Sequence, residues 1–224
     1  ERSNEDKVNN KLLTAKEVFD RIGYGFGSVQ FINILFYMTG AGFFLIGIVN
    51  GLKTIFSLII SSFLQEYSKA RSIGKRFMSK AGILFGMSFL FISLAVVIQS
   101  WALFSLSLLV GSVGVVTYGD LYNKLVEETL KKEKMSRFLL RISHYGVIIT
   151  GISLLLAGYL FDKFPAMGSG VVRVSLFGKS FPVFGYLISF EITALAFILS
   201  GYVLHFIKEK KVAPLAIHGF FKDY

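Results

Sequence analysis

The sequence contains no cysteine, and charged residues make up only 17% of its 224 positions. Without cysteine the chain can form no disulfide, no thiol nucleophile and no cysteine-based metal site. Its three histidines are dispersed and form no metal-ligand pattern. The sequence also shows no nucleotide-binding loop, no nucleophile–base pair and no cleavable secretory signal. We therefore expect neither an enzymatic activity nor a cofactor.

Hydrophobic residues, by contrast, make up 54% of the chain, and the mean hydropathy is +0.63. A helix that crosses a bilayer core of about 30 Å needs about 20 mostly apolar residues. The sequence contains several runs of this length, which cannot all be buried inside a soluble protein of this size. The composition therefore predicts an all-α, multi-pass membrane protein that is surrounded by lipids.

Six apolar segments predict six transmembrane helices in a domain over 22–207. They cover 22–39, 42–65, 81–99, 102–122, 142–161 and 184–206. Residues 1–21 carry apolar positions at helical spacing, which is typical of an amphipathic helix on the cytoplasmic surface, although a partly frayed arm is an equal alternative. Residues 208–224 form a cytoplasmic tail or an inter-half linker. Alternating residues around Phe177-Gly178-Lys179 predict a short extracellular β-hairpin between the fifth and sixth helices.

The formal net charge of +10 could suggest nucleic-acid binding, but the position of the charge argues against it. Lysine and arginine gather in four groups: 2–21, 69–80, 124–141 and 208–222. These groups alternate with nearly uncharged connections, as the positive-inside rule expects of cytoplasmic segments. The pattern predicts cytoplasmic N and C termini and an integral protein of the plasma membrane, with no nucleic-acid partner.

A polar stripe runs along the second predicted helix, and Lys53 lies beside it. The stripe consists of residues three or four positions apart: Asn50, Thr54, Ser57, Ser61 and Gln65. Lys53 is the only lysine or arginine inside the six predicted spans. A lysine in mid-membrane costs about 2.5–3.5 kcal/mol on insertion scales, so it usually faces a cavity and binds a solute. A structural ion pair, or a side chain that snorkels outward, is the alternative.

Four further residues are candidates for the lining of the same cavity: Gln30, Asn33, Asn50 and Tyr118. The amides of Gln30, Asn33 and Asn50 could equally form hydrogen bonds between helices. Glu191, inside the sixth helix, is a candidate for ion coupling, since burial raises the pKa of a carboxyl group. A structural ion pair is the other interpretation of Glu191.

The helix pattern and one loop together resemble the N-terminal six-helix half of a major facilitator superfamily transporter, over about 19–211. That family carries Gly-x-x-x-Asp-Arg/Lys-x-Gly-Arg/Lys-Arg/Lys between its second and third helices. Here Ser62 takes the place of the first glycine, Glu66 that of the acid, and Gly74-Lys75-Arg76 resemble the final element, at a longer spacing. The resemblance implies that Glu66, Lys75 and Arg76 form a conformational latch with Asp120, at the inner end of the fourth helix.

The resemblance implies a secondary transporter half that moves a small solute by alternating access. Such a transporter needs a second six-helix half, which is part of the same polypeptide, another chain, or a second copy in a homodimer. The chain begins at Glu1 rather than at methionine, which favours a fragment of a longer polypeptide. The alternative function is a non-transporting membrane scaffold or assembly subunit. A transporter requires the polar stripes of the first, second and fourth helices to meet at a wet cavity, whereas a scaffold would pack them dry.

Overall fold

The structure is a computed structural model that describes residues 2–70, 75–130, 132–165, 172–176 and 179–207. Side chains 2–6, 65–70, 123–124, 128, 132–134, 172–176 and 179–183 are outside the description. The predicted tail over 208–224 and the centre of the predicted turn at 177–178 also lie outside the described residues.

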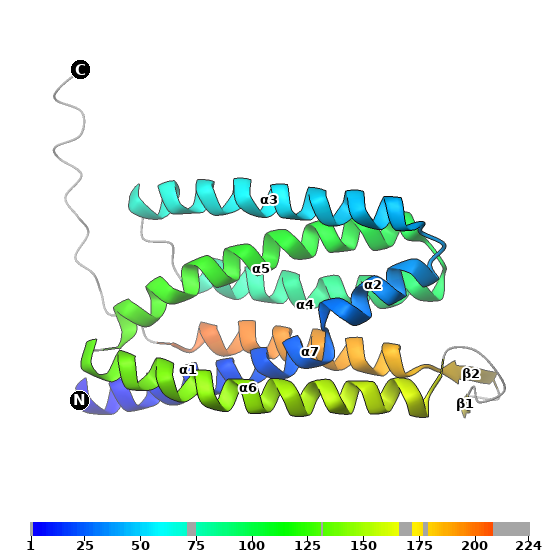
Figure 1. Ribbon diagram of the computed structural model, residues 1–224. Coiled ribbons are helices and arrows are strands. Elements are labelled where there is room, and N and C mark those ends of the chain that lie inside the picture. Colours follow the sequence, from blue (N-terminus) through cyan, green and yellow to red (C-terminus); the bar gives the residue numbers. More distant parts are fainter. Residues whose placement is uncertain (1, 71–74, 131, 166–171, 177–178, 208–224) are drawn as a thin grey trace, which may run out of the picture.

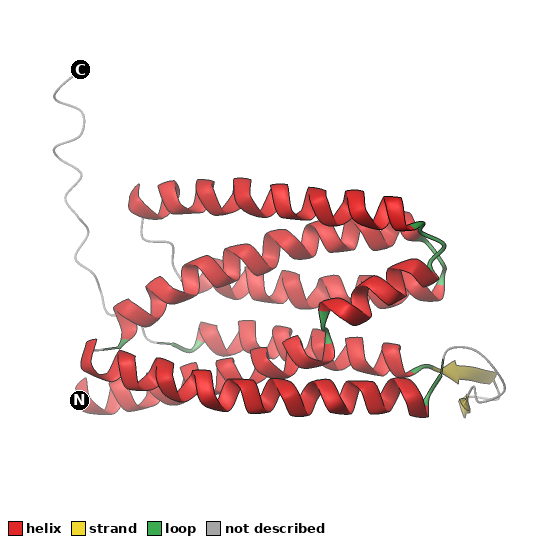
Figure 2. Ribbon diagram, in the orientation of Figure 1, coloured by secondary structure: helices red, strands yellow, loops and turns green. Residues whose placement is uncertain are grey.

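Seven helices and two short strands make up the described fold (Figures 1 and 2). The helices are α1 (Arg2–Phe26), α2 (Val29–Met38), α3 (Phe43–Ala70), α4 (Lys75–Val97), α5 (Trp101–Thr129), α6 (Lys132–Lys163) and α7 (Gly185–His205). The strands β1 (Val172–Leu176) and β2 (Lys179–Val183) pair antiparallel between α6 and α7, with Val172 opposite Val183.

Five of these helices, α3 to α7, are long and apolar enough to cross a membrane. They coincide with the last five predicted segments, although α3 to α6 begin or end several residues beyond the predicted bounds. The extra turns are polar and charged, so an apolar run alone does not reveal them. The helices run roughly along one common axis, and the two strands lie beyond one end of the bundle (Figure 1).

The first predicted helix, 22–39, differs from the structure because the chain breaks inside it. α1 ends at Phe26, and α2 begins at Val29 after Ser28, whose φ and ψ of −63° and 149° are extended. Gly27 is enclosed at this break: a Cβ there would lie 2.6 Å from the Thr193 side chain. Glycine–serine pairs are common sites of helix breaks. The segment is therefore two helices, the polar α1 and the short, mostly apolar α2.

The N-terminal segment also differs from the expected surface arm. α1 is continuous from Arg2 and packs against α6 and α7. Leu13 and Lys16 within it are fully or almost fully buried. The second half of α1 therefore belongs to the bundle.

The helices pack in an order that repeats within the chain. α4 packs against both α5 and α7, α1 packs against α7 and α6, and α3 packs against α5. If α1–α2 is exchanged with α5, α3 with α6, and α4 with α7, the α4–α5 pair becomes the α1–α7 pair, and the α3–α5 pair becomes the α1–α6 pair. The α4–α7 pair is unchanged. α3 and α6 lie at opposite edges of the bundle and are the least enclosed of the long helices (Figure 1).

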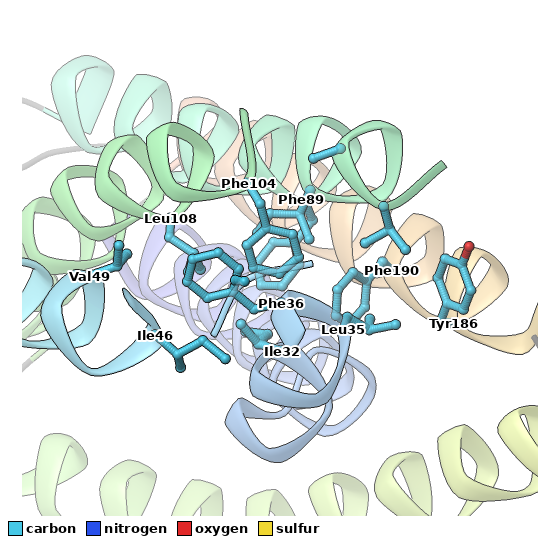
Figure 3. Close-up of a cluster of buried hydrophobic side chains, with 14 of the residues drawn as sticks. Ile32, Leu35, Phe36, Ile46, Val49, Phe89, Phe104, Leu108, Tyr186 and Phe190 are labelled. Atoms are coloured by element: carbon cyan, nitrogen blue, oxygen red, sulfur yellow. The ribbon is translucent and has the colours of Figure 1, made fainter. Parts of the chain in front are cut away.

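Two groups of buried side chains hold the bundle together. One lies toward the end with the strands and joins α2, α3, α4, α5 and α7 (Figure 3). At its centre the rings of Phe36 and Phe104 stack with centroids 4.6 Å apart and an interplanar angle of 7°. The other group lies toward the opposite end and includes Leu13, Met78 and Leu204.

The contact between α4 and α7 depends on small residues where the two backbones approach closely. A Cβ on Gly86 of α4 would lie 2.7 Å from the carbonyl oxygen of Ala194 and 2.9 Å from the amide nitrogen of Ile198. Both atoms belong to the α7 backbone and cannot move without shifting the helix. Gly151 of α6, by contrast, has nothing within 4 Å of the position of a Cβ.

We therefore expect Gly86→Ala to lower the stability of the protein and Gly151→Ala to leave it unchanged or raise it. Overpacking costs about 1–3 kcal/mol, whereas alanine in place of an unobstructed helical glycine gains up to about 1 kcal/mol. Thermal unfolding of the purified chain in detergent measures both. Equal midpoints for the two variants would contradict the close approach of α4 and α7.

Candidate functional site

A cavity of about 190 Å³ lies where α1, α2, α3, α4 and α5 meet. Its described lining is mostly aliphatic and aromatic, with hydroxyl groups from Tyr24, Ser57, Ser88 and Ser112. Lys53 is the only charged residue among the described residues that line it. The cavity is therefore an apolar pocket with a single positive charge, a combination typical of small-molecule sites.

Lys53 extends from α3, and its side chain is only partly exposed. Among the described residues, no hydrogen bond or ion pair reaches its ammonium group. Ionisable residues in membrane spans normally pair with one another or face water. The structural ion pair considered for Lys53 is thus not found in the described part of the chain. Lys53 instead lines the cavity.

The other predicted cavity residues do not gather around Lys53. Asn50 donates a hydrogen bond from Nδ2 to Oδ1 of Asn33 over 3.1 Å, and so links α3 to α2. Gln30 is exposed and is not among the described residues that line the cavity. The two asparagines therefore form the interhelical bond that was their alternative interpretation, and they lie on the two helices that bound one side of the cavity.

Tyr118 lies away from this cavity, in a buried polar cluster. Its hydroxyl group donates to Oδ1 of Asp20 over 3.0 Å and lies 2.5 Å from Oγ of Ser200. Ser200 also donates to the same Asp20 oxygen over 2.5 Å. These contacts turn Tyr118 toward α1 and α7. The prediction that Tyr118 lines the cavity with Lys53 is wrong in this respect.

Lys16 supplies the positive charge of this cluster. Its Nζ lies 2.7 Å from Oδ2 of Asp20 and 3.1 Å from Oε1 of Glu17. The ammonium group also lies 3.1 Å from the ring centroid of Tyr122 and 4.7 Å from that of Tyr118, within the range of cation–π attraction. We call Lys16, Glu17, Asp20, Tyr118, Tyr122 and Ser200 the buried polar cluster.

The buried polar cluster joins three helices that are distant in the sequence. α1 contributes both signs of charge, α5 the two tyrosines, and α7 the serine. Lys16 and Asp20 are 2% and 4% exposed. A buried pair of this kind is costly to break from one side, because the remaining charge is left without compensation. The cluster therefore fixes the position of α1 in the bundle.

Sequence reasoning missed this cluster because Lys16, Glu17 and Asp20 belong to a segment that was assigned to the cytoplasmic surface. Two signals could have indicated it. Lys16 and Asp20 are four positions apart, and so are Tyr118 and Tyr122, which places each pair on one helical face. A lysine and an acid on the same helical face as the apolar residue Leu13 favour an internal pair.

Two of the four residues of the predicted latch, Asp120 and Lys75, have described partners outside the latch. Asp120 accepts a hydrogen bond from Ser61 over 2.5 Å, so its observed partner lies on α3 rather than in the basic loop. Lys75 donates to the carbonyl oxygen of Ile207, just past the end of α7. Arg76 is exposed, and the side chain of Glu66 lies outside the described residues. The described contacts thus link α3 to α5 and α4 to the end of α7.

Glu191 is exposed on α7, between the buried residues Phe190 and Thr193. It has no hydrogen bond or ion pair to any described residue. Its carboxyl group therefore does not enter the cavity or the buried polar cluster.

Comparisons with protein families, with curated proteins and with solved structures find no match to this chain. The class of protein is therefore inferred from the helices of this chain alone. Five helices are long and apolar enough to cross a membrane, which is compatible with an integral membrane protein.

The buried polar cluster predicts a strong dependence of stability on both members of its ion pair. We expect Lys16→Met to destabilise the protein by about 3–5 kcal/mol, because the buried carboxylate of Asp20 loses its only described ion-pair partner. The double variant Lys16→Met/Asp20→Leu should lose much less than the sum of its single variants.

Thermal unfolding in detergent measures this cycle, and Asp162→Asn is the matched control, since Asp162 is exposed at the end of α6. If the single effects are small and additive, the cluster does not hold α1 in place.

Proposed function

We propose that the chain is one six-helix half of a secondary transporter of the major facilitator type, which moves a small solute by alternating access. The observation that carries the proposal is the cavity with Lys53 at the meeting point of α1, α2, α3, α4 and α5. The polar stripe of α3 reaches this cavity at Ser57, and Lys53, which lies beside the stripe, lines it as well. A transporter requires a cavity where its helices meet, whereas a scaffold does not. Of the polar residues predicted to line that cavity, Lys53 is the one found among the described residues of the lining.

The internal repeat of the helix packing supports the same proposal. Within each half of a major facilitator transporter, two groups of three helices are related as inverted repeats. Here α1–α2, α3 and α4 would form the first group, and α5, α6 and α7 the second. The exchange of the two groups preserves the main packing pairs, and α4 and α7 pack together at the centre of the exchange.

The two least enclosed helices support the presence of a second half. α3 and α6 lie at opposite edges of the bundle, and most of their apolar side chains are exposed. Lipid covers part of this surface, and the second half covers the side on which the cavity opens. That half is a further part of the same polypeptide, another chain or a second copy.

The distribution of basic residues favours an orientation in the membrane. Lys7 and Lys11 of α1, Lys75 and Arg76 of α4, and Arg137 of α6 lie toward the end of the bundle where α1 begins. By the positive-inside rule this end is cytoplasmic. The strands β1 and β2 then lie on the extracellular side of the plasma membrane.

Single cysteines in the naturally cysteine-free chain would test this orientation. Gly42, between α2 and α3, and Ser136, near the start of α6, are both exposed. In intact cells we expect a membrane-impermeant thiol reagent to modify Gly42→Cys but not Ser136→Cys, and in inside-out vesicles the reverse. Modification of both from the same side would contradict the topology.

The scaffold remains the second candidate function, because the buried polar cluster is itself a rigid, internally paired element. The two functions differ in how Ser57 becomes accessible. In a transporter the cavity opens alternately to each side of the membrane, so we expect Ser57→Cys to react with an impermeant reagent in both vesicle orientations. In a scaffold it reacts from one side at most.

The control for this experiment is Ser189→Cys. Ser189 is fully buried and donates a hydrogen bond to the carbonyl oxygen of Phe26 over 3.2 Å, so a cysteine there should stay unmodified from either side. If the reagent modifies Ser57→Cys in only one of the two vesicle orientations, the cavity opens to one side of the membrane alone, and alternating access at this cavity is ruled out.

A further inference from the structure

We propose that the Lys53 cavity binds a free organic monoanion, a carboxylate with an apolar body about the size of a benzene ring. This inference rests on the proposed function, because it names the class of solute that the same cavity would take. Three properties of the cavity carry the proposal: its charge, the distribution of its hydroxyl groups, and its volume.

The charge of the described lining is unbalanced. Lys53 is its only charged residue, and no described acid pairs with it. In a span that is otherwise uncharged, an ammonium group is most stable when a counter-charge comes close to it. Since the described chain does not supply one, a bound anion would, and one positive charge matches one negative charge.

The hydroxyl groups of the lining define which end of the cavity is polar. Ser88 donates its proton to the carbonyl oxygen of Phe85 over 2.6 Å, and Ser112 donates to that of Leu109 over 2.7 Å. These two serines therefore present only lone pairs, which repel an anion. Ser57 lies one helical turn after Lys53 on the same face of α3. The carboxylate would thus bind at α3.

The rest of the cavity fits an apolar body. Phe85, Phe89 and Ile92 of α4 and Leu108 and Val115 of α5 line it. Its volume is about 190 Å³, and an engineered apolar cavity of about 150 Å³ in another protein holds benzene. A ring of that size with a carboxyl group attached matches the available space.

Benzoate and benzamide are suitable probes because they have nearly the same shape and differ in charge. The experiment titrates each into the full chain in phosphatidylcholine nanodiscs and follows binding by saturation-transfer NMR. We expect benzoate to bind saturably and at least tenfold more tightly than benzamide. Lys53→Met should reduce the affinity for benzoate to that for benzamide, whereas Lys53→Arg should keep most of the difference in affinity between the two probes.

Two further variants separate the charge from the cavity. Val115→Phe keeps Lys53 but fills part of the cavity, so it should weaken the binding of both probes. Lys163→Met removes a basic residue at the end of α6, outside the described lining of the cavity, and should leave the affinity for both probes unchanged. Circular dichroism and gel filtration establish that each variant is folded before titration.

Several results would overturn the proposal. Benzamide binding as tightly as benzoate would mean that the cavity selects neutral solutes, and an unchanged affinity in Lys53→Met would place the anion elsewhere. Loss of benzoate binding when phosphatidylglycerol is added to the nanodiscs would make a lipid headgroup the occupant. Accessibility of Ser57→Cys is measured separately. If benzoate binds but Ser57→Cys is accessible from one side only, transport is refuted and the anion site stands. If Ser57→Cys is accessible from both sides but benzoate does not bind, the anion site is refuted and transport stands.

Discussion

The ion pair between Lys16 and Asp20 is the interaction on which the arrangement of the bundle depends. Two opposite charges are nearly excluded from water, and their hydrogen-bonding partners come from α5 and α7. Because a charge left alone in this environment is so unfavourable, α1 must lie where Tyr118 and Ser200 can complete the cluster. Once α1 is fixed, α6 and α7 have a surface to pack on.

The fixed position of α1 also determines where the cavity lies. Past the buried polar cluster, α1 ends at Phe26, and the chain turns into α2, which is tied to α3 through Asn33 and Asn50. The cavity opens between these two segments, with the start of α2 and Lys53 on its border. The α1–α2 segment thus has two roles: the buried polar cluster anchors α1, and the start of α2 forms part of the cavity lining.

Most of the fold could be predicted from the sequence, because the length of the apolar runs alone indicates where the long helices lie. A run of about 20 apolar residues has few alternatives to a membrane helix, so five of the predicted segments correspond to long helices. The break at Gly27–Ser28 could not be recognised in the same way. A glycine in an apolar run is as typical of close packing as of a break, and only the extended backbone of Ser28 in the structure distinguishes the two.

The candidate site was predicted only in part. Lys53 could be found because a single charge in an apolar run is conspicuous. Tyr118 could not be assigned correctly, since helical periodicity shows which residues share a face but not which neighbour that face meets. The charged residues of α1 were placed at the surface for a related reason: their burial depends on partners from α5 and α7, about 100 and 180 residues further along the chain.

The sparse packing of α3 has a consequence for how variants of this protein are interpreted. Most of its apolar side chains face away from the rest of the described chain, so few contacts with neighbouring side chains hold the helix in place. A substitution on its outward face therefore removes little from the cooperative core. Heat denaturation will register changes in α4 or α7 and miss most of those in α3, the helix that carries Lys53, so assembly and ligand binding are the informative measurements there.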